Sequence, residues 1–101
     1  MKVLFICNQN QNRSKTAAEL FKQKYETRSA GLYNEHPVTQ EQLAWADVIV
    51  VMEDAQRTEL SKRFPRYYLQ KKIISLDIPD IYRKDQPELI QELRKKIKIL
   101  T

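Results

Sequence analysis

The feature that most constrains this fold is the alternation of short strand-like runs with segments of helical periodicity. The strand-like runs lie at residues 2–6, 26–30, 48–52 and 72–76. The helical segments lie at 14–25, 39–47, 53–63 and from about residue 86 onward. This alternation predicts an α/β fold over residues 1–101, a single three-layer domain with a four-stranded parallel sheet and helices on both faces.

Two details of the pattern concern helix ends. Thr39 is followed three positions later by Gln42, which is the capping-box pattern at the start of the second helix. Phe64 and Pro65 are expected to end the third helix and to lead through a loop into the last strand.

The composition is that of a packed globular domain, with 42% hydrophobic and 31% charged residues. The apolar run at 2–6 is too short for a secretory signal, and no run reaches the roughly 18 residues of a membrane span. We therefore expect a cytoplasmic protein with no membrane partner. The net charge of +5 favours anionic partners such as phosphorylated molecules, and the lack of a nucleic-acid motif argues against nucleic acid.

Two residue types occur once each. Cys7 is the only cysteine, which excludes an internal disulfide and a cysteine metal cluster. Gly31 is the only glycine, so backbone positions that need a positive φ are expected to use asparagine or aspartate.

A polar loop lies between the first strand and the first helix. Its residues are Cys7, Asn8, Gln9, Asn10, Gln11, Asn12, Arg13 and Ser14. A loop of this length can curl around one tetrahedral anion with its amides inward, and at least one asparagine is expected in the left-handed conformation. The helix N-terminus and the Arg13 guanidinium add positive charge, which also favours the Cys7 thiolate. A nucleophile inside a phosphate-binding loop predicts phosphoryl transfer through a phosphocysteine, with the Ser14 hydroxyl donating to the thiolate.

The loop resembles the signature of the low-molecular-weight protein tyrosine phosphatases. That signature is a cysteine directly after the first strand, then five residues, an arginine and a serine or threonine, with asparagine three positions after the cysteine. Cys7, Asn10, Arg13 and Ser14 occupy these places. The resemblance continues through residues 29–31 and 46–52 and covers most of the chain, which is shorter than well-studied members.

The resemblance implies a two-step reaction without metal or other cofactor. Cys7 attacks phosphorus while Arg13 and the loop amides hold the phosphate oxygens. An aspartate in the loop after the last strand protonates the leaving oxygen and then deprotonates water.

Two aspartates compete for the acid–base role. Counting back from Leu89 in the last helix favours Asp80, and Tyr82 then matches a tyrosine that lines the family's substrate pocket. Asp77 is the alternative, because it follows the strand more closely.

The leading prediction is a cysteine-dependent phosphatase that hydrolyses phosphomonoesters, with protein phosphotyrosine as the expected substrate and inorganic phosphate as a product. Phosphoarginine and small phosphate esters stay open. One alternative is a phosphate-recognising binding module that lost turnover, because Gln9 replaces the family's usual loop glycine and the pocket region is shortened. Another is an arsenate reductase, although such enzymes normally need further cysteines.

Overall fold

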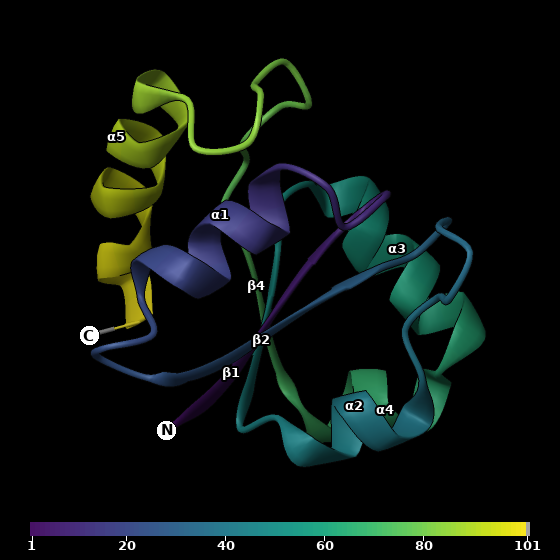
Figure 1. The fold of residues 1–101 in the computed structure, drawn as a ribbon. Coiled ribbons are helices and arrows are strands. Elements are labelled where there is room, and N and C mark those ends of the chain that lie inside the picture. The colour runs from purple at the N-terminus through teal and green to yellow at the C-terminus, as the bar shows by residue number, and fades with distance from the viewer. Residues whose placement is uncertain (101) are drawn as a thin grey trace.

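The computed structural model describes residues 1–100 and has the predicted α/β architecture (Figure 1). The strands are β1 (Lys2–Cys7), β2 (Glu26–Gly31), β3 (Val48–Val51) and β4 (Lys72–Ser75). They form one parallel sheet in the order β2-β1-β3-β4. The helices are α1 (Arg13–Leu20), α2 (Gln40–Trp45), α3 (Asp54–Arg63), α4 (Pro65–Gln70), α5 (Pro87–Lys96) and the 3₁₀ helix η1 (Ile97–Leu100).

The sheet has a buried core on each face. Side chains of β1 alternate between the two cores, because successive residues of a strand point to opposite faces. Val3 and Phe5 pack with residues of α1 and α5, while Leu4 and Ile6 pack on the other face with residues of α2 and α3. Figure 1 shows α1 and α5 on one side of the sheet and the helices α2, α3 and α4 on the other. The predicted fold class is confirmed.

Because the strands are parallel, the segments that follow β1, β3 and β4 all leave from the carboxyl end of the sheet. From β1 the chain passes to β2 on one side, and later returns to β3 on the other side of β1. The chain leaves β1 toward β2 and leaves β3 toward β4, in opposite directions. The adjacent carboxyl ends of β1 and β3 therefore form a topological switch point, where ligands bind in such sheets. The segment after β4 lies beside the carboxyl end of β3, where Ile78 N–H donates to Met52 O at 2.8 Å.

Two helix predictions need correction. The first helix ends at Leu20 and not at residue 25, and Phe21 N–H closes its last turn on Ala17 O. The segment from Pro65 to Gln70 forms α4, although it was expected to be a loop. Pro65 begins this helix because proline fits the first helical position, where its missing N–H is no loss.

Left-handed backbone positions follow the sequence prediction. The non-glycine residues with positive φ are Asn10 (54°), Asp77 (56°) and Asp85 (61°). Gly31 does not have a positive φ, and close contacts explain why it is glycine. A Cβ there would lie 2.6 Å from Asn34 Oδ1 and 3.0 Å from the backbone oxygen of Asn8.

Candidate active site

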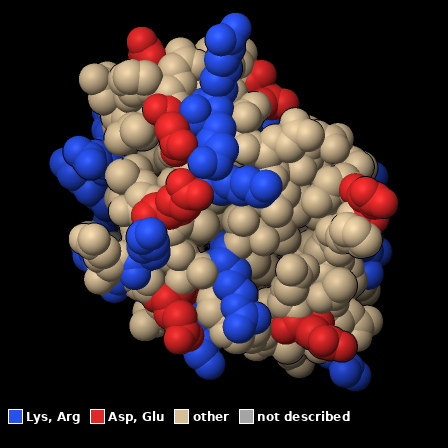
Figure 2. All heavy atoms as spheres, in the orientation of Figure 1, with Lys and Arg blue, Asp and Glu red and all other residues tan. Residues whose placement is uncertain are grey.

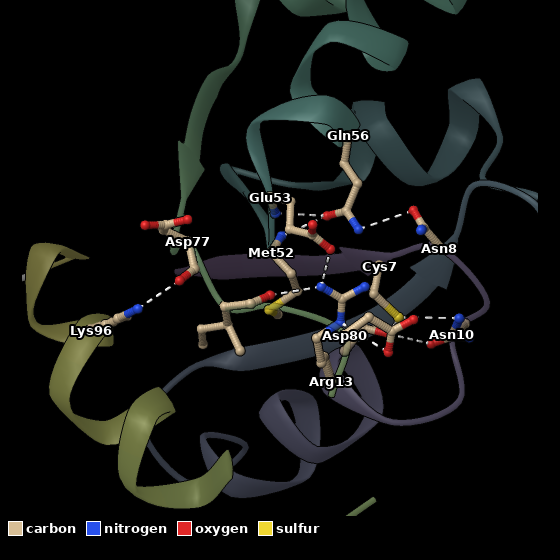
Figure 3. A network of polar contacts seen from close by, with 12 residues as sticks. Cys7, Asn8, Asn10, Arg13, Met52, Glu53, Gln56, Asp77, Asp80 and Lys96 are labelled. Atoms are coloured by element: carbon tan, nitrogen blue, oxygen red, sulfur yellow. Dashed lines mark hydrogen bonds and ion pairs between the residues drawn. The ribbon is translucent and has the colours of Figure 1, made fainter. Parts of the chain in front are cut away.

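The Cys7 thiol lies at the end of β1 and is 3% exposed. Its Sγ accepts a hydrogen bond from Asn10 N–H at 3.2 Å and lies 3.0 Å from Ser14 Oγ (Figure 3). Ser14 Oγ donates its hydrogen to Asn10 Oδ1 at 2.8 Å. The positive φ of Asn10 turns the loop back on itself, so that its amide reaches the sulfur. The loop thus surrounds the sulfur with groups that can stabilise a thiolate.

Arg13 is a buried cation with one donor edge free. Its Nη1 donates to the Glu53 carboxylate and, at 2.7 Å, to Ile78 O (Figure 3). Its Nε is buried without a hydrogen-bond partner and lies 3.8 Å from the carboxylate of Asp80. Because guanidinium donors lie in one plane, the Nε and Nη2 edge can bind two oxygens of an anion.

A small cavity of about 40 Å³ opens beside these groups. It is lined by Cys7, Gln9, Gln11, Asn12, Arg13 and Asp80. One water needs roughly 10–15 Å³ of such volume, so the cavity has the size of a small oxyanion. Asn8, Asn10 and Ser14 were predicted to bind phosphate and are not among the lining residues. Asn10 and Ser14 instead bond the sulfur and each other.

The N-terminus of α1 adds to the positive potential at this cavity. The N-cap residue Asn12 makes no side-chain capping bond, and the first turn contains no acidic residue. The first amides of the helix are therefore not satisfied by a cap, which is the usual arrangement at an anion site.

The structure separates the two candidate aspartates. The Asp80 side chain is 56% exposed and lines the cavity. Asp77 does not line it, and Figure 3 shows the Asp77 carboxylate directed away from Cys7. The backbone oxygen of Asp77 instead accepts a bond from Lys96 Nζ at 2.6 Å. Tyr82 is half-buried against the core and is also absent from the cavity lining.

The segment that carries Asp80 is fixed at both ends. Ile78 bonds Met52 and Arg13 through its amide and carbonyl groups, as described above. At the other end, Asp85 N–H donates to Thr16 Oγ1 on α1 at 2.9 Å. The hydrogen bond from Lys84 to Asp85 raises the pKa of the exposed Lys84 ammonium. Asp80 therefore lies on a short span between two anchored positions.

Two residues of the site were not identified from the sequence. Glu53 was not predicted to lie at the site, and its carboxylate pairs with Arg13. Gln56 received no role, yet it is 2% exposed and its Nε2 donates to Asn8 Oδ1 at 3.1 Å. The sequence pattern that could have identified them is a capping box, with Glu53 directly after the strand-like run 48–52 and Gln56 three positions later. This pattern lies at the carboxyl end of the strands, where the phosphate loop was also predicted. In residues 1–100 no cluster of three His, Cys, Asp or Glu residues could hold a metal ion.

Comparisons with known proteins bear on the fold. No protein-family model and no curated protein sequence matches the chain. A low-molecular-weight protein tyrosine phosphatase from Bacillus subtilis is 24% identical with a TM-score of 0.76, covering 99% of this chain and 97% of that one. The tyrosine phosphatase Wzb from Escherichia coli K30, in complex with phosphate, is 22% identical with a TM-score of 0.78, covering 98% and 94%.

A third similar structure is YwlE arginine phosphatase, a mutant with a phosphorylated active-site serine. It is 22% identical with a TM-score of 0.77, and the match covers 99% of this chain and 95% of that one. The chain therefore has the fold of the low-molecular-weight protein tyrosine phosphatases, as the sequence predicted.

Proposed function

We propose that this protein is a cysteine-dependent phosphatase that hydrolyses phosphomonoesters through a phosphocysteine intermediate. The observation that carries the proposal is a single cavity lined by a thiol, a guanidinium with a free donor edge and a carboxylate: Cys7, Arg13 and Asp80. These groups match the needs of nucleophilic attack on phosphorus, binding of its oxygens, and proton transfer.

In the first step the Cys7 thiolate attacks phosphorus, so that an S–P bond forms as the ester P–O bond breaks. The Nε and Nη2 hydrogens of Arg13 and the first amides of α1 bind the phosphoryl oxygens. Asp80, in its protonated form, gives its proton to the leaving oxygen, and an alcohol or phenol departs.

In the second step the Asp80 carboxylate takes a proton from water as the water oxygen attacks phosphorus. The S–P bond breaks, which releases inorganic phosphate and restores the Cys7 thiolate. The Ser14 hydroxyl, 3.0 Å from Sγ, turns its hydrogen from Asn10 Oδ1 to the sulfur and stabilises the thiolate as it leaves. Asp80 ends the cycle protonated and ready for the next ester.

Protein phosphotyrosine is the substrate class that we propose first, and the two similar tyrosine phosphatases support it. Phosphoarginine is the second candidate, and the YwlE arginine phosphatase has the same fold. Two features of the cavity favour it: no aromatic side chain of residues 1–100 lines the wall, and the exposed Asp80 carboxylate can pair with a guanidinium.

The distribution of charge supports small phosphorylated groups over nucleic acid as partners. On the face drawn in Figure 2, acidic and basic side chains are interspersed. Nucleic-acid binding domains instead gather their basic residues in a patch or stripe. None of the helices within residues 1–100 is long and apolar enough to cross a membrane. The cytoplasmic location stays a prediction.

The test is hydrolysis of p-nitrophenyl phosphate by the wild type and by Cys7→Ser, both with EDTA present. We expect turnover by the wild type and only background hydrolysis by the variant. Phosphorus NMR should show that Cys7→Ser still binds inorganic phosphate, which controls for an unfolded site. Equal activity of the two proteins would exclude the mechanism, and phosphate binding without any wild-type turnover would favour the binding module.

A further inference from the structure

A second groove, of about 230 Å³, lies beside the free edge of the sheet. It is lined by Arg57, Tyr68, Leu69, Lys71 and Ile73. These residues come from α3, from α4 and its C-terminal end, and from β4, and none of them lines the cavity at Cys7. The groove therefore has no part in the chemistry proposed above.

The groove borders backbone groups that have no strand partner. β4 is an edge strand, and within residues 1–100 it pairs only with β3. Leu76 N–H donates to Val51 O, so the backbone groups of Leu76 face β3. Because successive residues of a strand direct their backbone groups to opposite sides, Ile73 and Ser75 direct theirs to the open edge. Such an edge can pair with an added extended chain.

The groove also holds positive charge that no carboxylate neutralises. Arg57 Nε is buried without a hydrogen-bond partner, and Arg57 Nη2 reaches Ile73 O only at 3.4 Å. Lys71 Nζ donates to the backbone oxygens of Ala44 and Ala46, at 3.0 and 2.7 Å, which fixes the ammonium beside the groove. Within residues 1–100, neither Arg57 nor Lys71 forms a salt bridge.

We propose that this groove docks an extended peptide segment that carries a carboxylate side chain and, two positions away on the same face, an apolar one. The segment adds to the outer edge of β4, and its carboxylate accepts hydrogen bonds from Arg57. The apolar side chain two positions away covers Leu69, which is 83% exposed at the rim. Because β4 has four residues, the interface is small and the binding weak, as in transient complexes.

The test is a titration of the full ¹⁵N-labelled chain with a capped pentapeptide that has glutamate at its centre, valine at both ends and threonine between them. The glutamate and valine side chains then share one face of the extended peptide. We expect shifts confined to the amides of Ile73 and Ser75, to residues of α4 and to the Arg57 side chain. Arg57→Gln should weaken binding by about tenfold or more, because it removes charge-assisted hydrogen bonds. Arg66→Gln is the matched control: it removes the same charge from an exposed position on α4 outside the groove, and should bind as the wild type does.

Four results would overturn the proposal. One is the absence of saturable shifts at the edge of β4. The second is equal binding by Arg57→Gln, and the third is equal binding of a peptide with lysine in place of glutamate. The fourth is edge shifts that grow with protein concentration in the absence of peptide, which would identify a second copy of the chain as the occupant. Titrating Cys7→Ser separates this site from the catalytic proposal, because its peptide binding should be unchanged.

Discussion

The side chains of Gln56 and Asn8 are joined by a hydrogen bond of 3.1 Å across 48 positions of the sequence. The side-chain oxygen of Gln56, Oε1, also accepts hydrogen bonds from the backbone amides of Met52 and Glu53, at 2.7 and 3.0 Å. One buried amide group therefore ties the start of α3 to the phosphate loop. The same turn supplies Glu53, the partner of Arg13. The first turn of α3 thus supports the loop at two points.

Replacing Gln56 with alanine should loosen the loop as well as destabilise the fold. Buried amides left without partners cost about 1–3 kcal/mol of unfolding free energy, and Asn8 also loses its anchor. Urea denaturation measures the first effect, and the Kd for inorganic phosphate measures the second.

Gln42→Ala provides a matched control for Gln56→Ala. Gln42 makes the same type of bond, accepting from Thr39 N–H at 2.9 Å, but in an exposed capping box on α2. This variant should lose some stability and keep the wild-type Kd for phosphate. If both variants bind phosphate equally well, the link from Gln56 to Asn8 does not position the loop.

Glu53→Gln should strengthen phosphate binding by about threefold to tenfold. The substitution keeps an oxygen acceptor for Arg13 Nη1 but removes a negative charge that competes with phosphate for the guanidinium. Glu53→Ala removes the acceptor too, so Arg13 is less well fixed and phosphate should bind more weakly. Calorimetric titration of both variants separates charge from positioning, and weaker binding by Glu53→Gln would show that the carboxylate charge does not compete.

Asp80→Asn should lower kcat/KM, which reports the phosphoryl-transfer step, by about 10²–10⁴-fold with phenyl phosphate, whose leaving group needs a proton. The loss of kcat/KM should be smaller with p-nitrophenyl phosphate, because p-nitrophenolate leaves without protonation. Asp77→Asn is the natural control, since the structure links Asp77 to Lys96 through its backbone oxygen and not through its carboxylate. A larger loss in Asp77→Asn would transfer the acid–base role to that residue.

Gly31→Ala should destabilise the fold by about 1–3 kcal/mol through overpacking. The added Cβ would meet Asn34, whose side chain can turn away, and the Asn8 carbonyl, which cannot. That carbonyl accepts from Leu32 N–H at 3.0 Å and Tyr33 N–H at 2.8 Å, so moving it breaks hydrogen bonds. Urea denaturation of Gly31→Ala should therefore show a loss that the added change Asn34→Ala does not restore. Full rescue by the double variant would contradict this reading.

The sequence predicted the parts of this molecule that depend on local patterns. Strand-like runs, the Thr39 capping box and the spacing from Cys7 to Ser14 are visible in neighbouring residues, and they determine the sheet and the loop. The short helix after Phe64 was missed because proline was taken only as a terminator, although it also fits a first helical position.

The contacts that complete the site could not be predicted in this way. Arg13 meets Glu53 and Ile78 across 40 and 65 positions, and only the sheet order brings these segments together. The choice between Asp77 and Asp80 depends on the path of a loop whose backbone takes a left-handed turn at Asp77. No pattern in the neighbouring residues shows which of the two carboxylates lies at the cavity.

The central claim is that phosphate passes through a covalent bond to Cys7. The most direct measurement is the intact mass of Asp80→Asn quenched in acid during turnover of p-nitrophenyl phosphate. Phosphocysteine should accumulate in this variant, because its formation needs no acid for this leaving group while its hydrolysis has lost the base. We predict a mass increase of one phosphoryl group located on Cys7. Continued turnover with no adduct, or a phosphoryl group on another residue, would contradict the account.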